Sequence, residues 1–199
     1  MENTYITLED IKKTKINIKK SVFISEGLEV QNHQQAMDFV GLIKNKYPDA
    51  NHHCWAYIID KNILSDDNGE PHGTAGIPIL NVIKRKQLNN LVIVVIRYFG
   101  GKKLGVRGLI NAYRLVTENF IKEAITVTRN SGFMYEIICN FNYANKLSVS
   151  HDKKFKIIKQ EFSDTVMMTI FIQSDVISYY EEEFKSNNIK IVSKNESVK

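Results

Sequence analysis

One stretch limits the possible folds of this chain more than any other. The residues LVIVVIRYF, from Leu91 to Phe99, are apolar at nearly every position. A strand with one solvent-exposed face alternates apolar and polar residues, whereas a strand buried on both faces is apolar throughout. The stretch therefore predicts a central strand covered on both sides, which requires further strands beside it and helices above and below.

A glycine-rich turn and a helix follow this strand. The turn contains Gly100, Gly101, Gly105 and Gly108. Beyond it, the segment LINAYRLVTENFIKEA places apolar residues along one stripe at helical spacing: Leu109, Ala112, Val116, Phe120 and Ala124. The pattern predicts an amphipathic helix that starts near Leu109 and packs on the sheet.

The residues before the central strand supply the other elements of a first domain. TKINIKKSVFISEGLEV alternates in two short runs and predicts two strands. NHQQAMDFVGLIKNKYP predicts a helix that begins near Asn32, a possible cap, and stops at Pro48. HHCWAYIID predicts a strand, and we expect Asp60 to Gly76 to form a polar loop.

A second domain is expected after the segment RNSG at 129–132, which has the composition of a linker. The following elements read strand, short helix, strand, strand, helix, strand, which is the ferredoxin-like order. We therefore predict an α+β protein of two small domains, residues 1–130 and 133–199.

Composition limits the environment of the chain. No segment of the 199 residues is apolar for long enough to cross a bilayer, and the start lacks the apolar region of a signal peptide. The two cysteines, Cys54 and Cys139, do not form a disulfide framework. We expect a cytoplasmic protein with reduced cysteines and no membrane partner.

The net charge of +5 is distributed unevenly. From Pro71 to Thr117 the chain has no acidic residue, but the same segment carries eight cations: Lys84, Arg85, Lys86, Arg97, Lys102, Lys103, Arg107 and Arg114. A block of one sign attracts phosphates or an acidic protein surface. An ordinary solvated face is the alternative.

The glycine-rich turn has two interpretations. Its spacing matches neither the G-x-x-x-x-G-K-[ST] phosphate loop nor the dinucleotide G-x-G-x-x-G pattern. Lys103 and Arg107 beside the start of a helix would nevertheless attract an anion, because free N–H groups and a partial positive charge lie there. A tight turn with solvated cations is the other interpretation.

Two further segments contain residues capable of chemistry. Asp67 and Glu70 in SDDNGEPHGTAGIPIL could pair for metal binding or acid–base work, or could simply belong to a turn. A zinc site or a reactive thiol could be formed by residues of the types found at His52, His53 and Cys54. Adjacent strand residues face opposite sides, however, so only His52 and Cys54 would share a face. The simpler interpretation is that Cys54 is buried and unreactive and that Trp55 packs in the opposite layer.

Three stretches together resemble the signature of the YigZ/IMPACT family, also called UPF0029: NHHCWAY, DDNGEPHGTAGIPIL and VVIRYFGGKKLGVRGLINAY. The resemblance covers roughly Ser21 to Ala124. The signature positions that we single out are His52, Cys54, Asp67, Glu70, Gly73, Thr74, Gly76, Tyr98, Gly100, Gly101, Gly105 and Gly108. The chain departs from the pattern at Asn68, where a second aspartate is usual, at Arg107, where glycine is usual, and at Asn111, where arginine is usual.

The resemblance implies a first domain like the second domain of ribosomal small-subunit protein five. It also implies a second domain like the last domain of elongation factor G. Eukaryotic relatives regulate translation by competing for the activator of an initiation-factor kinase, whereas this chain resembles the bacterial type. A translation-linked binding role rests on this analogy of fold.

We therefore expect a protein without catalytic residues, cofactor or metal that contacts RNA, the ribosome or an acidic protein partner. Its anion-binding residues would be Arg97, Lys102, Lys103, Arg107 and Arg114, with Tyr98 or Tyr113 stacking on a base. The alternative is an enzyme acting on a nucleotide or another phosphorylated small molecule. It would use the glycine turn as an anion hole and Asp67 with Glu70 as reacting groups.

Overall fold

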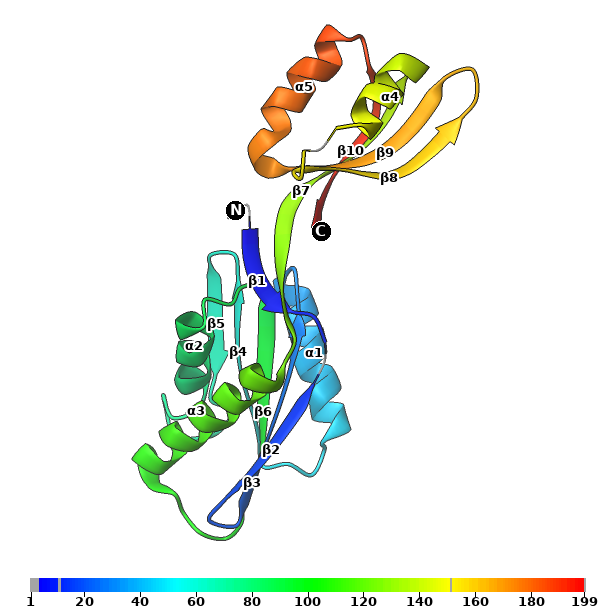
Figure 1. Cartoon of the computed structure of the whole chain (residues 1–199). Helices are drawn as coiled ribbons and strands as arrows, with labels where there is room; N and C mark the ends of the chain where they lie inside the picture. Colours follow the sequence, from blue (N-terminus) through cyan, green and yellow to red (C-terminus); the bar gives the residue numbers. More distant parts are fainter. Residues whose placement is uncertain (1–3, 11, 151, 199) are drawn as a thin grey trace. The chain divides into compact units, whose positions relative to one another are not determined.

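The computed structural model describes residues 4–10, 12–150 and 152–198 (Figure 1). The chain divides into two compact units, one formed by Tyr5–Thr128 and the other mainly by Arg129–Lys199. The mixed α+β class predicted from the sequence is confirmed. Within the described ranges, no helix is both long and apolar enough to cross a membrane.

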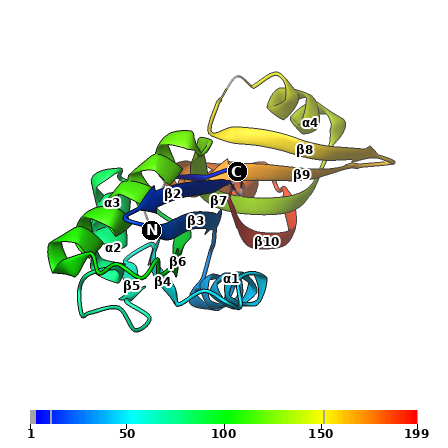
Figure 2. The same ribbon diagram turned by 90° about the horizontal axis from the view of Figure 1, so that it is seen from below.

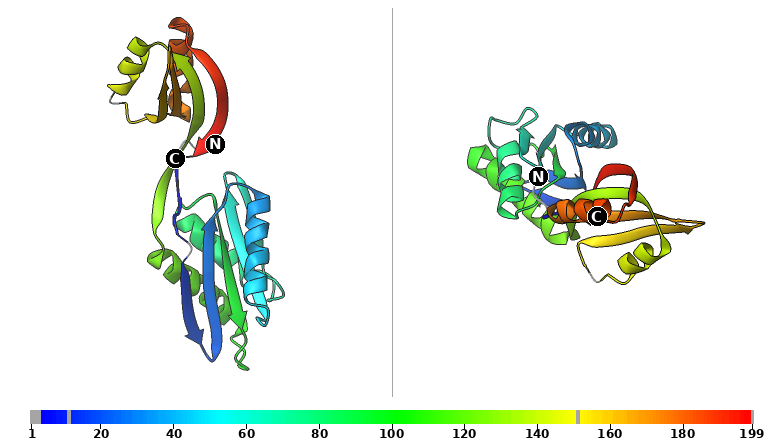
Figure 3. Two further views of the ribbon diagram at one scale, coloured as in Figure 1. Left: turned by 90° about the vertical axis from the view of Figure 1, so that its right-hand side faces the viewer. Right: turned by 90° about the horizontal axis from the view of Figure 1, so that it is seen from above.

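The first unit is a five-stranded sheet with helices on both faces. Its elements are β2 (Lys13–Ile18), β3 (Ser21–Glu29), α1 (His33–Lys46), β4 (His52–Ile59), β5 (Asn62–Asp66), α2 (Gly76–Arg85), β6 (Leu91–Tyr98) and α3 (Gly105–Glu123). The preceding strand β1 (Thr4–Leu8) is not part of this sheet and pairs with β7 (Thr126–Cys139) instead. The sheet has the order β2-β3-β6-β4-β5, and its neighbouring strands are antiparallel. Figures 2 and 3 show α1 on one face of this sheet and α3 on the other.

The central strand β6 divides the core of this unit into two layers. Leu91, Ile93 and Val95 pack on the side of α2 and α3, and Val92 and Val94 pack on the side of α1. Each of these side chains is fully buried. The prediction of a strand covered on both faces is therefore confirmed. This burial agrees with the sequence, in which every residue from Leu91 to Ile96 is apolar.

The second unit has the strand–helix–strand–strand–helix–strand order expected from the sequence. It consists of β7 (Thr126–Cys139), α4 (Phe141–Ser148), β8 (Phe155–Phe162), β9 (Val166–Gln173), a 3-10 turn (Ser174–Val176), α5 (Ile177–Ser186) and β10 (Lys190–Val198). β7 lies between β10 and β9, and β8 pairs with the far side of β9, all antiparallel. This is the ferredoxin-like arrangement.

Three sequence predictions about elements are wrong. The segment 129–132 is not a linker, since β7 runs through it. A Cβ on Gly132 would lie 2.3 Å from the Ile172 carbonyl oxygen and 2.6 Å from the Phe171 ring, so this glycine permits close packing.

The other two errors lie in the first unit. The segment from Asp60 to Gly76 is not all loop, because it contains β5 and ends at the first residue of α2. The helix α3 begins at Gly105, four residues before the expected Leu109, because Gly105 and Gly108 are accommodated in its first turn.

Candidate functional site

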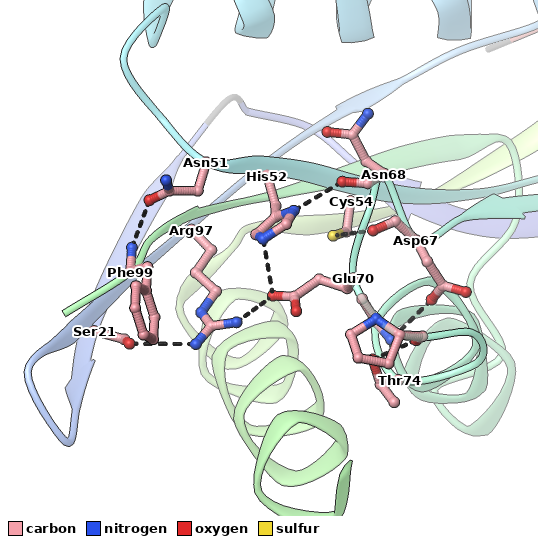
Figure 4. A network of polar contacts seen from close by, with 12 residues as sticks. Ser21, Asn51, His52, Cys54, Asp67, Asn68, Glu70, Thr74, Arg97 and Phe99 are labelled. Atoms are coloured by element: carbon pink, nitrogen blue, oxygen red, sulfur yellow. Dashed lines mark hydrogen bonds and ion pairs between the residues drawn. The ribbon is translucent and has the colours of Figure 1, made fainter. Parts of the chain in front are cut away.

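A buried ion pair joins two of the signature segments. Arg97 at the end of β6 and Glu70 in the loop after β5 are 4% and 8% exposed. The Arg97 Nη1 atom lies 2.5 Å from Glu70 Oε1, and the Tyr113 hydroxyl of α3 donates to the same oxygen at 2.8 Å. Figure 4 shows the Arg97 and Glu70 side chains pointing toward each other. The pair therefore ties the loop to β6 and α3.

The Arg97 guanidinium is also fixed by its other neighbours. Its carbon lies 5.4 Å from the ring centres of both Phe23 and Phe99, a geometry that favours cation–π attraction. Its Nη2 atom lies 3.4 Å from Ser21 Oγ, and its buried Nε has no hydrogen-bond partner among the described atoms. The prediction that Arg97 meets phosphates at the surface is wrong, because the side chain is buried and neutralised by Glu70.

Asp67 organises the start of α2. Its Oδ2 accepts the Gly73 N–H at 2.7 Å, and its Oδ1 accepts the N–H groups of Ala75 and Gly76 at 2.9 and 2.8 Å. Burial alone would raise the pKa of Asp67, but these three backbone hydrogen bonds outweigh burial and hold its pKa below the ordinary value. Asp67 thus serves as the cap for a helix that lacks one at Ala75.

The remaining polar signature residues support the same loop. The Thr74 hydroxyl donates to the Pro71 carbonyl at 2.6 Å, and His52 Nδ1 lies 2.8 Å from the Asn68 carbonyl oxygen. His52 Nε2 is 3.9 Å from Glu70 Oε1. Asn68, which replaces the usual aspartate, accepts the backbone N–H of His53 through its side chain at 2.7 Å.

Cys54 lies inside this network. It is fully buried, with its sulfur 2.9 Å from the Asp67 carbonyl oxygen and 3.3 Å from the Tyr113 hydroxyl. Burial raises the pKa of the Cys54 thiol, which opposes formation of a reactive thiolate. Trp55 packs in the opposite layer, as the alternation of the strand predicted.

A hollow of about 710 Å³ adjoins the loop. It is lined by Ser65, Asp66, Asp67, Asn68, Gly69, Glu70, His72 and Ile77. Within the part of the chain that the structure describes, no three histidine, cysteine or carboxylate side chains are grouped to hold a metal ion. The carboxylates of Asp67 and Glu70 are instead occupied by backbone amides and by Arg97 with Tyr113.

The glycine-rich turn has a partner that the sequence did not reveal. A Cβ on Gly100 would lie 2.1 Å from the carbonyl carbon and oxygen of Lys20, so the backbones of the two turns are in direct contact. The Gly100 N–H also donates to Ser21 Oγ at 3.2 Å. The turn between β2 and β3, with Lys19 and Lys20, therefore lies against the turn between β6 and α3.

This contact gathers five exposed cations, Lys19, Lys20, Lys102, Lys103 and Arg107, which we call the basic tip. None of the five forms an ion pair with any residue that the structure describes. The adjoining sequence contains no acid from Ile11 to Ser25 or from Pro71 to Thr117. The tip is therefore positive without local compensation.

The N-terminus of α3 adds to this charge. α3 begins at Gly105 without a side-chain cap and without an acidic residue in its first turn, where Gly108 also lies. Its first N–H groups are consequently free of side-chain acceptors and carry a partial positive charge. Gly101 and Lys102 lie in the turn just before it.

Three predicted binding residues lie elsewhere. Arg114 pairs with Glu118 one turn further along α3, with 3.1 Å between Nη1 and Oε2. Tyr113 is fully buried, so the prediction that it stacks on a base is wrong. Tyr98 is half-buried and packs on the α1 side of the sheet. Phe99, which is 45% exposed, is the aromatic side chain next to Gly100.

Strand alternation could have signalled part of this outcome. Arg97 shares its face of β6 with Ile93 and Val95, the face that a helix covers. Lys19 and Lys20 separate two alternating runs, as hairpin turn residues do. Their position beside Gly100 was not visible in the sequence because it depends on the pairing of β3 with β6.

Residues 19–121 match the family model described as the Impact N-terminal domain. The chain is also 31% identical over 186 residues to the IMPACT family member YvyE of Bacillus subtilis, a match that covers 92% of this chain and 86% of the relative. The chain belongs to the IMPACT family. The resemblance inferred from the signature stretches is therefore confirmed.

Two further comparisons cover most of the chain. The IMPACT family member YigZ of Escherichia coli is 27% identical over 169 residues, covering 82% of this chain and 83% of the relative. A crystal structure described as that of a hypothetical protein aligns with a TM-score of 0.69 and 23% identity, covering 97% of this chain and 98% of its own. The latter shows a shared fold.

The segment that matches the IMPACT family model includes both the buried network and the basic tip. The signature residues of this chain therefore have two structural roles. Asp67, Glu70 and Arg97 hold the loop, the sheet and α3 together, while Gly100 allows two turns to meet at the surface.

Proposed function

We propose that this chain is a translation-linked binding protein that contacts RNA or the ribosome through the basic tip. The observation that carries the proposal is the contact of Gly100 with Lys20, because it joins two acid-free turns into one cationic surface. Cations without local partners attract phosphate groups and release their counterions on binding.

The geometry at the tip suits a phosphate backbone. The N–H groups at the start of α3 can cap a phosphate oxygen, while lysines on both turns supply full charges. Phe99 is available as an exposed aromatic surface for an unstacked base, as in many proteins that bind single-stranded RNA. Phosphate contacts would supply affinity and the aromatic contact would add little sequence preference.

Family membership supports the link to translation. The family resemblance implies eukaryotic relatives that regulate translation, and it implies unit folds like those of modules in ribosomal and translation-factor proteins. This support is an analogy of fold, whereas the charge of the basic tip is a property of this chain.

The enzyme alternative receives less support from the site. It requires Asp67 and Glu70 to be free for metal binding or proton transfer. Asp67 instead accepts three backbone N–H groups, and Glu70 accepts Arg97 and Tyr113. A binding role therefore fits the arrangement better.

The proposal is tested by the salt dependence of RNA binding. We expect the triple variant Lys102→Ala, Lys103→Ala, Arg107→Ala to bind a fluorescent RNA hairpin with a single-stranded loop more weakly. The slope of log affinity against log salt should fall by about 2 to 3 units, because each lost phosphate contact removes nearly one. Fluorescence anisotropy over a salt series measures both quantities.

A matched control removes the same charge elsewhere. Lys153, Lys156 and Lys185 are exposed lysines of the second unit, and their triple alanine variant should leave the slope unchanged. An equal slope in the tip variant and the wild type would refute the proposal. Co-sedimentation with ribosomes at low and high salt then separates ribosome binding from binding to free RNA.

A further inference from the structure

The strand β5 forms a free edge of the sheet in the first unit. It pairs with β4 and has no second neighbour in the strand order (Figure 1). In an antiparallel ladder, every second residue directs its N–H and C=O groups away from the partner strand. Among the described residues, none makes a backbone hydrogen bond to the outer side of Asn62–Ser65.

The two edges of this sheet differ in how they are protected. At the opposite edge, β2 carries the exposed lysines Lys13 and Lys15, and lysine on an edge strand opposes pairing with another chain. In β5, Ile63 and Leu64 are 42% and 48% exposed, and no charged residue lies between Lys61 and Asp66. β5 is thus open to an incoming strand along about four residues, or roughly 13 Å.

Hollows lie at both ends of β5. A hollow of about 610 Å³ is lined by Tyr57, Ile59, Ile63 and Leu64 together with polar residues from the start of α1 and the β4–β5 turn. The hollow of about 710 Å³ described above lies at the other end, where Ser65 and Asp66 contribute to its wall. A paired strand would therefore find a hollow for a side chain near each of its ends.

The charge along this edge is opposite to that of the basic tip. Asp60, Asp66 and Asp67 lie at or just beyond its ends, whereas Lys61 is the cation of the β4–β5 turn. The protein as a whole carries +5, so this edge is a local reversal of sign. It would repel nucleic acid and attract a basic side chain.

We propose that β5 is a docking edge for an extended segment of a partner protein, which adds a strand to the sheet and places a basic side chain near Asp66. Ile63 and Leu64 face opposite sides of the sheet, so consecutive side chains of the segment, one on each face, would contact them. The inference is independent of the proposed function, because it concerns another surface and another class of partner.

The test uses three synthetic fluorescent peptides with alternating valine and threonine. One has arginine at both ends, one has glutamate at both ends, and one is the arginine peptide with alternate backbone nitrogens methylated. We expect the arginine peptide to bind best and the methylated peptide to bind roughly tenfold or more weakly, because methylation removes strand hydrogen bonds. Fluorescence polarisation gives the affinities, and amide NMR shifts locate the contact at Asn62–Asp66.

Three protein variants sharpen the result. Leu64→Lys should weaken the arginine peptide by roughly tenfold. Leu42→Lys, at a 56% exposed position of α1, is the matched control and should leave binding unchanged. Asp66→Asn retains the acceptor for the Asn68 N–H but should reduce the preference for arginine over glutamate.

Several outcomes would overturn the proposal. One is equal binding of the methylated peptide, which needs no protein variant and so does not depend on how well Leu64→Lys folds. Another is a set of NMR shifts that excludes β5. Concentration-dependent dimerisation that Leu64→Lys abolishes would instead make a second copy of the chain the occupant of this edge.

Discussion

Arg97 and Glu70 illustrate, at the scale of single residues, how a charged side chain can serve the fold rather than a ligand. Removing two charges from water is costly, and their attraction offsets this cost only with good geometry and further hydrogen bonds. Here Tyr113, Ser21 and the rings of Phe23 and Phe99 complete the surroundings of the pair. The pair therefore specifies one position of the loop against β6.

The first residue prediction concerns this pair. Arg97→Met should lower the free energy of unfolding by about 3–5 kcal/mol, because it leaves the Glu70 carboxylate buried without its partner. The double variant Arg97→Met, Glu70→Gln should recover part of the loss. Urea denaturation of the four proteins in the cycle measures the coupling, and additive effects of the two substitutions would contradict it.

Asp67 leads to a second residue prediction, which depends on pH. Because its folded pKa is lowered, the unfolded chain binds the proton more tightly, and the contribution of Asp67 to stability is complete above its ordinary pKa. The contribution is lost as pH falls through the lowered folded pKa. Asp67→Asn should therefore cost about 1–3 kcal/mol at neutral pH, with the difference from wild type shrinking below about pH 4.

Urea unfolding at a series of pH values checks this expectation. Asp164→Asn serves as the control, because Asp164 is exposed in the turn between β8 and β9. A constant difference between wild type and Asp67→Asn across the acid range would show that the Asp67 charge does not stabilise the start of α2.

At the scale of elements, the strands and helices with a complete apolar pattern were predictable. The apolar run of β6 is not interrupted by a polar residue between Leu91 and Ile96. The helix α1 begins at the cap Asn32 predicted from the sequence, where Asn32 Oδ1 accepts the Gln35 N–H at 2.9 Å. By contrast, β5 has no buried residue, and α2 is capped by Asp67 from eight residues before Ala75. Local patterns do not contain that information.

Part of the candidate site could likewise be predicted from the sequence, and part could not. The signature residues could be named from the sequence, and the exposure of Lys102 and Lys103 agrees with their expected place in a turn, whereas Arg107 is exposed in the first turn of α3. The roles of Asp67 and Glu70 could not be read, because their partners come from other elements. The sequence does not identify Lys19 and Lys20 as part of the site, because their position beside Gly100 depends on the pairing of β3 with β6.

The element prediction concerns this meeting of turns. Gly100→Ala should cost about 1–3 kcal/mol of stability, because the added Cβ would overlap the Lys20 backbone and force the turns apart. It should also weaken RNA binding at the basic tip. Gly41→Ala in α1 is the matched control, since nothing lies within 4 Å of its Cβ position.

Thermal or urea unfolding and anisotropy check both effects. Gly41→Ala should be neutral or stabilising, because alanine favours a helix over glycine by about 1 kcal/mol. Equal stability of Gly100→Ala and wild type would mean that the two turns separate without cost.

For the whole molecule, the net charge of +5 conceals surfaces of opposite sign within the first unit. The basic tip lies where β2 meets β3 and β6 meets α3, whereas Asp60, Asp66 and Asp67 lie at or just beyond the ends of the edge strand β5. Total charge therefore does not identify the partners of this protein. Under the two proposals, a nucleic acid and a protein segment would bind through different residues and would not compete.

The contact between Gly100 and Lys20 also bears on how sequences of this kind can diverge. An exposed turn usually tolerates insertions, because nothing beyond its own hydrogen bonds depends on its length. Here the length of each turn is set by the other, so an extra residue in one requires a compensating change in the second. The two turns should consequently evolve as a unit, whereas the isolated turn at Ser163–Thr165 is free to vary in length on its own.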